Sequence, residues 1–260
     1  MYGRLPVFAF LILAFVGTAC LADPGSTGIV LLHGNGHPTK AIGPLVKELE
    51  NRGFHVTNPE MPWSIDRRYD KDVDAAVEQV KAAFEELKSK GADKLIIAGH
   101  SKGGVFALYY ASMYPVDGLV AIAPGGNVAG KRYKKELGDS VAKAKKLIKA
   151  GKGDAVATFK DLEGSRGVTS LETTASSYFS WYGREGAMNS KLSAERLGSN
   201  VPVLWIVPTD DYPGLKKSNR SLFDSFPSNS HTKLYEPSAN HKTAPAVSVE
   251  EISGWLSALD

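Results

Sequence analysis

The sequence predicts an α/β fold in which a mostly parallel central sheet carries helices on both faces. Short apolar runs typical of buried strands alternate with amphipathic helical segments along most of the chain. The 260 residues suffice for one large domain with a full core. A single interval of about eighty residues between two strand-like runs is much longer than one crossover helix needs. We therefore expect a cap-like insertion between two strands of the sheet.

The first part of the chain predicts two strands and two helices in alternation. Residues 28–32 form a continuous apolar run of the kind found in parallel sheets, and a helix is expected over 42–52. A short strand is expected at 54–57. Residues 70–90 then place apolar side chains at spacings of three and four, which predicts a long amphipathic helix.

A glycine-rich hexapeptide at residues 99–104, with the sequence GHSKGG, lies between a strand at 94–98 and a helix at 105–114 that Pro115 ends. The pattern G-x-S-x-G arises often by chance in a chain rich in glycine, but between a strand and a helix it predicts a nucleophile elbow. Small residues on either side allow the tight turn. Ser101 is then exposed at a helix N-terminus, where free backbone N–H groups can stabilise an anion.

The last part of the chain predicts three more strands and a closing helix. The closing helix is expected at 248–258, where Ser248 and Glu251 have the spacing of a capping box. The strands are expected at 118–123, 203–207 and 232–235.

The insertion spans residues 127–200, before the strand expected at 203–207. Its pattern is helical at 132–150 and, more weakly, at 155–162, and aromatic residues gather at 176–182. Two interpretations stay open. The insertion is either a cap over the site with aromatic side chains facing the substrate, or a decorated crossover with those side chains in its own core.

A serine nucleophile needs a base within hydrogen-bond reach and an acid that orients the base. In known enzymes with a similar strand–serine–helix turn, the chain order is Ser, acid, His, and the histidine follows the last strand. This resemblance favours His241 among the six histidines as general base. The alternative is a histidine in a surface loop. Asp210 and Asp211 both follow the strand at 203–207, and the spacing favours Asp211 as the acid, although proline stands at 208 where glycine is usual.

The oxyanion hole needs two backbone donors. The N–H of Lys102, directly after the serine, is one candidate. The other is expected from the loop HGNG at 33–36, where Asn35 is the natural donor and its flanking glycines let the backbone approach a carbonyl.

These motifs together resemble the α/β-hydrolase superfamily, over about residues 27–258: HGNG at 33–36, GHSKGG at 99–104, PTDD at 208–211 and NH at 240–241. The resemblance implies an eight-strand type of sheet and ester or related acyl-transfer chemistry without a cofactor. The loop at 33–36 is also similar to that of haloalkane dehalogenases. Those enzymes carry an aspartate nucleophile, and Ser101 at that position argues against dehalogenation.

The combined prediction is an exported serine hydrolase that cleaves a carboxylic ester or related small acyl substrate through an acyl-enzyme on Ser101. A thioesterase, an amidase or an acyltransferase with the same residues is an alternative. A non-catalytic binding protein of the same fold is another. No metal site is predicted, because no histidine pair has helical ligand spacing.

Export is predicted from residues 1–22, where a basic start, an apolar stretch and small residues are typical of a cleaved signal peptide. The hydrolase domain is then expected at 23–260, in the periplasm or secreted. The one cysteine, Cys20, lies within this segment. Cleavage after Ala19, in place of Ala22, would leave Cys20 at the N-terminus, where a lipid could be attached. This is the one route by which membrane contact is expected from the sequence. Gly17, three residues before Cys20, matches the lipobox of lipoproteins poorly.

The net charge of +3 is small, and no basic run is dense enough to predict nucleic-acid binding. The lysines of 131–152 are interpreted as the solvated face of a helix. Oligomeric state is not indicated by the sequence.

Overall fold

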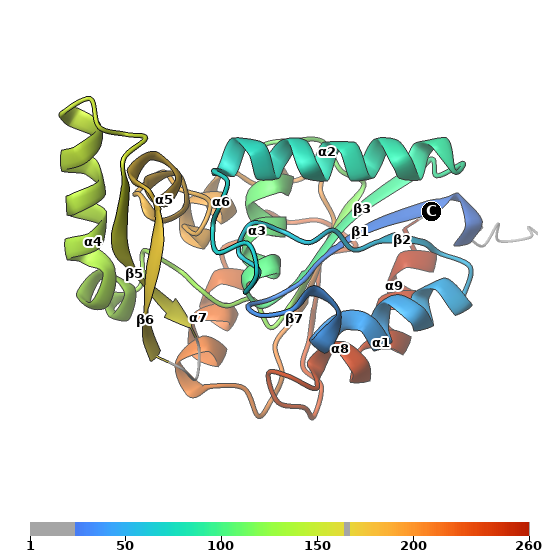
Figure 1. The fold of residues 1–260 in the computed structure, drawn as a ribbon. Helices are drawn as coiled ribbons and strands as arrows, with labels where there is room; N and C mark the ends of the chain where they lie inside the picture. Colours follow the sequence, from blue (N-terminus) through green and yellow to red (C-terminus); the bar gives the residue numbers. More distant parts are fainter. Residues whose placement is uncertain (1–23, 164–166, 260) are drawn as a thin grey trace, which may run out of the picture.

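The computed structural model describes residues 24–163 and 167–259, so the predicted signal peptide and Cys20 lie outside the described residues. A parallel sheet with strand order β2-β1-β3-β4-β7-β8 forms the centre (Figure 1), which confirms the predicted fold class. The resemblance implied eight strands, whereas the described residues place six in this sheet. The strands are β1 (Thr27–Leu32), β2 (His55–Thr57), β3 (Lys94–His100), β4 (Gly118–Ile122), β7 (Val203–Ile206) and β8 (Lys233–Tyr235).

Helices cover both faces of the sheet because successive strand residues point to opposite sides. In β1, Val30 and Leu32 pack with α2 and α3 on one face, while Ile29 and Leu31 pack with α1 and α9 on the other. Figure 1 shows these layers above and below the strands. The helices are α1 (Pro38–Asn51), α2 (Val73–Ser89), α3 (Lys102–Ala111), α8 (Ala244–Val247) and α9 (Val249–Ser257).

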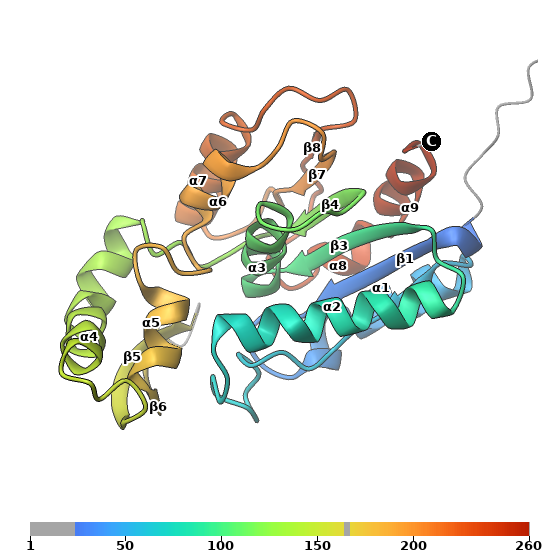
Figure 2. The ribbon, with the colours of Figure 1, turned by 90° about the horizontal axis from the view of Figure 1, so that it is seen from above.

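The insertion lies beyond the carboxyl ends of β1 and β3 (Figures 1 and 2). The helical expectation for 155–162 is wrong, because this segment pairs with the following one in an antiparallel hairpin. The pattern misled because Asp161, a charged residue, occupies a buried position of the strand. The insertion contains α4 (Lys131–Lys149), β5 (Val156–Glu163), β6 (Gly167–Thr174), α5 (Ala175–Tyr182) and α6 (Ser190–Arg196).

Two further differences concern the C-terminal part. A helix that sequence analysis missed, α7 (Pro213–Phe223), follows β7. The capping box is also wrong: Ser248 joins α8 directly to α9, and its buried hydroxyl has no hydrogen-bond partner among the described residues. Glu251 instead pairs with Lys233 at 2.7 Å. Since Ser248 lacks the extended backbone of an N-cap, its side chain does not reach back to the helix N–H groups.

Across residues 24–163 and 167–259, none of the helices is both long enough and apolar enough to span a bilayer.

Candidate active site

The tight turn at Ser101 depends on the glycines around it, because a side chain at their positions would not fit. Ser101 has φ 54° and ψ −119°, a left-handed conformation that costs a non-glycine residue energy. A Cβ on Gly99 would lie 2.3 Å from the Gly103 carbonyl oxygen, and a Cβ on Gly103 would lie 2.4 Å from that of Leu32. Only glycine fits at either position. The turn therefore presents the Ser101 side chain at the N-terminus of α3.

The structure brings Ser101 together with His241 and Asp211. The Nε2 atom of His241 lies 2.9 Å from the Ser101 Oγ, and its Nδ1 atom lies 3.0 and 3.2 Å from the two carboxylate oxygens of Asp211. Asp211 is buried and also accepts a hydrogen bond from the Tyr212 N–H at 2.7 Å. Asp210 is exposed, so of the two candidate acids only Asp211 reaches the histidine.

Two buried histidines hold the backbone around these side chains. The Nε2 atom of His100 donates to the His241 carbonyl oxygen at 2.8 Å, and burial lowers the pKa of His100 to about 4. The Nε2 atom of His33 accepts from the Met61 N–H at 2.9 Å, and the His33 carbonyl accepts from the Trp63 indole at 2.9 Å. Burial also lowers the pKa of His33. Both rings are therefore neutral near pH 7 and serve as rigid supports.

The loop after β1 lies directly against Ser101. A Cβ on Gly34 would come within 2.9 Å of the Ser101 Cβ, so this close approach depends on glycine. Among the described residues, none accepts a hydrogen bond from the backbone N–H of Asn35 or of Lys102. Asn35 is exposed beside Gly34, and Lys102 is the first residue of α3. Both predicted oxyanion donors therefore lie on segments that meet at Ser101, with their N–H groups free.

The side chain of Lys102 has a second role that sequence analysis missed. It is buried and extends into the insertion, where its Nζ atom lies 3.1 Å from Asp161 Oδ2. It also donates to the hydroxyls of Tyr69 and Tyr182, and the Tyr182 hydroxyl donates to Asp161. Burial, and then the Asp161 charge, raise the pKa of Tyr182 well above its ordinary value. We call Lys102, Tyr69, Asp161 and Tyr182 the buried lysine network.

The aromatic residues at 176–182 belong to the core of the insertion. Tyr178, Trp181 and Tyr182 are all buried. Trp181 packs edge-on against Trp63 with ring centroids 5.7 Å apart, which joins α5 to the main domain. Of the two interpretations left open, the placement of these side chains fits the core and not a surface that faces substrate.

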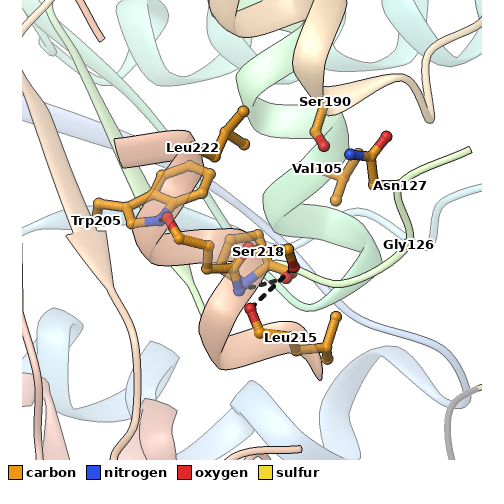
Figure 3. A pocket seen from close by; sticks show the side chains of 10 residues that line it. Val105, Gly126, Asn127, Ser190, Trp205, Leu215, Ser218 and Leu222 are labelled. Atoms are coloured by element: carbon orange, nitrogen blue, oxygen red, sulfur yellow. Dashed lines mark hydrogen bonds between the residues drawn. The ribbon is translucent and has the colours of Figure 1, made fainter. Parts of the chain in front are cut away.

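A narrow pocket lies between α3 and α7, and Leu215 is one of the residues that line it. A Cβ on Gly125 would lie 3.4 Å from both the Ser101 Oγ and the Leu215 Cδ1, so Leu215 and Ser101 both face the backbone at Gly125. Figure 3 shows the Trp205 indole and Leu222 on one side of the pocket, and Val105, Asn127 and Ser190 on the other. The Trp205 indole donates to the Asn219 carbonyl at 3.1 Å. All the lining side chains are uncharged: Val105, Pro124, Gly126, Asn127, Ser190, Trp205, Leu215, Ser218, Asn219 and Leu222.

Two residues near the site, Tyr212 and Leu215, were not predicted from the sequence. Tyr212, which is 42% exposed, places its ring 5.5 Å from that of His241. Leu215 lies on α7, whose start is marked by Pro213 at a position where proline favours a helix. That proline, with the spacing of Leu215, Asn219 and Leu222, could have predicted the helix.

Among the described residues, no group of three or more His, Cys, Asp or Glu side chains is placed to hold a metal ion.

Comparison with known proteins identifies the family. The family model described as "Serine aminopeptidase, S33" matches residues 25–244. The chain belongs to this family. It is one of the α/β-hydrolases, which confirms the resemblance drawn from the four sequence motifs.

Solved structures of other α/β-hydrolases share the fold of this S33-family chain. A monoacylglycerol lipase from Paleococcus ferrophilus is 23% identical, with a TM-score of 0.63 and coverage of 92% of this chain and 97% of that one. Est1E from Butyrivibrio proteoclasticus, solved with ferulic acid, is 15% identical, with a TM-score of 0.60 and coverage of 90% and 89%. A thermostable carboxyl esterase from Bacillus coagulans is 16% identical, with a TM-score of 0.59 and coverage of 89% and 88%. At these identities the likeness shows the fold.

Proposed function

We propose that this S33-family protein is a serine hydrolase that cleaves small carboxylic esters through an acyl-enzyme on Ser101. The observation that carries the proposal is the continuous hydrogen-bonded chain from the Ser101 hydroxyl through His241 to the buried Asp211 carboxylate. The names of the lipase and esterases that share the fold support ester chemistry by analogy.

In the acylation step, the Ser101 oxygen attacks the ester carbonyl carbon while Nε2 of His241 takes the hydroxyl proton. Asp211 accepts the Nδ1–H of His241, which fixes the tautomer with a free Nε2 lone pair and stabilises the imidazolium. The negative charge on the carbonyl oxygen is held by the N–H groups of Asn35 and Lys102. When the tetrahedral intermediate collapses, the C–O bond breaks and His241 gives its proton to the leaving alcohol.

Deacylation repeats the same steps with water as the nucleophile. His241 removes a proton from water as the oxygen attacks the acyl carbon, and the proton then passes to the Ser101 oxygen as the acid leaves. Neither step consumes a cofactor. Leu215, which faces the Gly125 backbone as the Ser101 Oγ does, supplies an apolar side chain on the α7 side of the reacting serine.

The same side chains can cleave an amide, and the family description names an aminopeptidase. An aminopeptidase must hold the charged amino end of its substrate next to the reacting carbonyl. A buried ammonium needs a carboxylate partner, and the residues that line the pocket supply none. This neutral lining supports an uncharged ester as the substrate.

The test compares hydrolysis of p-nitrophenyl acetate, p-nitrophenyl octanoate and an aminoacyl p-nitroanilide. We expect turnover of the esters that Ser101→Ala abolishes. The matched control is Ser89→Ala, an exposed serine at the end of α2, which should leave the rate unchanged. Turnover of the anilide alone would replace the ester proposal with aminopeptidase activity. Absence of any turnover would favour a non-catalytic binding protein.

We also propose that the protein is exported, on the strength of the pattern in residues 1–22. The intact mass of the protein recovered from the periplasm or medium tests this. A chain that begins at Asp23 supports a soluble product. A lipid-modified chain that begins at Cys20 supports a lipoprotein, and an uncleaved chain in the cytoplasm contradicts export.

A further inference from the structure

The charge of this protein is strongly segregated along the chain. Residues 131–152, which cover α4 and the turn after it, carry nine basic and two acidic side chains, a net charge of +7. The rest of the chain carries 22 basic and 26 acidic side chains, a net charge of −4. One helix therefore accounts for the positive sign of the whole molecule.

The basic side chains of α4 are exposed and without ion-pair partners. All nine are exposed, and no carboxylate among the described residues lies within ion-pair distance of them. On α2 the situation is the opposite, because Lys81, Lys88 and Lys90 each pair with a glutamate on the same helix at 2.5–2.8 Å. We call the nine residues the α4 basic face: Lys131, Arg132, Lys134, Lys135, Lys143, Lys145, Lys146, Lys149 and Lys152.

The position of α4 leaves this face open to a partner. The helix packs on β5 and α5 through Leu137, Ser140 and Ala144, which are buried. In Figures 1 and 2, α4 is the outermost element of the insertion, at the end of the molecule away from the C-terminus. The like charges repel one another in the absence of a partner, so an extended anionic surface would relieve that repulsion.

We propose that the α4 basic face binds the surface of an anionic phospholipid membrane. Eight of the nine side chains are lysines, which act as point charges suited to a diffuse field of lipid headgroups, whereas arginine is the residue that recognises bases and single phosphates in bidentate fashion. The helix carries one aromatic residue, Tyr133, which is not exposed, so it offers no platform for stacked bases. Val156, which begins β5 shortly after Lys152 in the sequence, is 70% exposed and offers an apolar contact.

The membrane contact proposed here differs from the one expected from the sequence, which depended on a lipid at Cys20. It goes beyond the proposed ester chemistry and does not require it. A membrane-bound orientation set by α4 would hold the insertion, and the site beside it, near the lipid surface from which an ester substrate could come.

The test measures sedimentation of the full chain with vesicles of phosphatidylcholine alone and of phosphatidylcholine with 30 mol% phosphatidylglycerol. Any apolar contribution of residues 1–22 is common to both vesicle types, so the difference between them reports the electrostatic part. We expect tighter binding to the anionic vesicles that weakens as salt is raised, because exposed charges are screened. Equal binding to the two vesicle types would overturn the proposal.

Two variants of equal charge change locate the surface. Lys145→Gln/Lys149→Gln/Lys152→Gln removes three charges from the basic face, and Lys81→Gln/Lys88→Gln/Lys90→Gln removes three from α2. Each lysine near an anionic surface contributes about fivefold in affinity, so the first variant should bind anionic vesicles at least roughly tenfold more weakly. The second should bind as the wild type does, and an equal loss in both would show that net charge alone drives binding, which would overturn the proposal.

Two more measurements separate this inference from the ester proposal and from nucleic-acid binding. Ser101→Ala should bind vesicles as the wild type does, and the α4 variant should hydrolyse a soluble ester at the wild-type rate. Failure of ester turnover would therefore leave the vesicle result intact. A single-stranded DNA oligonucleotide that binds at the same salt more tightly than the anionic vesicles would contradict the membrane assignment in favour of a nucleic-acid partner.

Discussion

Among the ion pairs of the described residues, the loss of one partner should cost the most stability at the buried pair of Lys102 and Asp161. The two side chains are only 3% and 6% exposed, so a lone charge left there cannot be solvated. Removal of one partner of such a pair costs about 3–5 kcal/mol of unfolding free energy. Replacement of both by apolar side chains removes the unpaired charge and should recover much of that loss.

The surroundings of the pair predict which single change costs more. If Lys102 becomes Met, the Asp161 carboxylate keeps hydrogen bonds from the Leu162 N–H at 2.7 Å and from the Tyr182 hydroxyl. If Asp161 becomes Leu, the acceptors that the described residues leave to the Lys102 ammonium are two neutral tyrosine hydroxyls. Asp161→Leu should therefore lie at the upper end of the range, near about 5 kcal/mol, and Lys102→Met near about 3 kcal/mol.

Urea unfolding of the two single variants and the double variant forms a double-mutant cycle. We expect a coupling energy of at least about 2 kcal/mol, with the double variant more stable than the sum of the two losses implies. The exposed pair Lys81–Glu78 is the control, and its cycle should give less than about 1 kcal/mol. Losses below about 1 kcal/mol for both Lys102→Met and Asp161→Leu, or losses that simply add in the double variant, would show that the pair is not a coupled buried ion pair.

Three further predictions concern the site and its supports. Burial lowers the pKa of His100 from 6.5 to about 4. As the pH falls through this range, His100 takes up a proton in the unfolded chain but stays neutral in the native protein. Unfolding free energy should therefore drop by roughly 3 kcal/mol between pH 6.5 and 4, and urea titrations of His100→Gln should show a flatter profile; parallel profiles would contradict this. Gly103→Ala places a Cβ against backbone and should cost about 3 kcal/mol or more, whereas Gly138→Ala, in open space on α4, should add about 0.5–1 kcal/mol; thermal unfolding measures both, and equal effects would count against the steric account. Asp211→Asn should lower kcat for ester hydrolysis by about 10⁴-fold while Asp210→Asn changes it by less than about twofold, and the reverse order would move the acid to Asp210.

The sheet and its helices were predictable because they follow local patterns. The apolar runs of β1, β3 and β4 and the spacing of apolar residues in α2 are direct consequences of burial in a parallel sheet. The segment that leads into Ser101 combined a strand, two required glycines and a helix, so its conformation could also be predicted. Each of these features depends on residues that are close in sequence.

What the sequence could not predict depends on contacts between distant segments. A charged residue at the buried position of Asp161 obscured the alternation of buried and exposed residues that is typical of a strand in β5. A carboxylate is stable at that position because Lys102 pairs with it. Ser248 had the spacing of an N-cap, but the helix packed directly before it left no extended residue at that point. The spacing after β7 favoured Asp211 over Asp210, but the contact of Asp211 with His241 depends on how the turn after β7 packs against the loop after β8. None of these contacts has a local signature.

Covalent labelling would show whether Ser101 is a nucleophile activated by His241. The protein would be treated with a fluorophosphonate, and the adduct located by mass spectrometry of the intact chain and of its peptides. We predict a single adduct on Ser101, its absence in Ser101→Ala, and slower labelling in His241→Ala. A wild-type protein that acquires no adduct, or acquires it on another residue while Ser101→Ala still hydrolyses esters, would contradict the account.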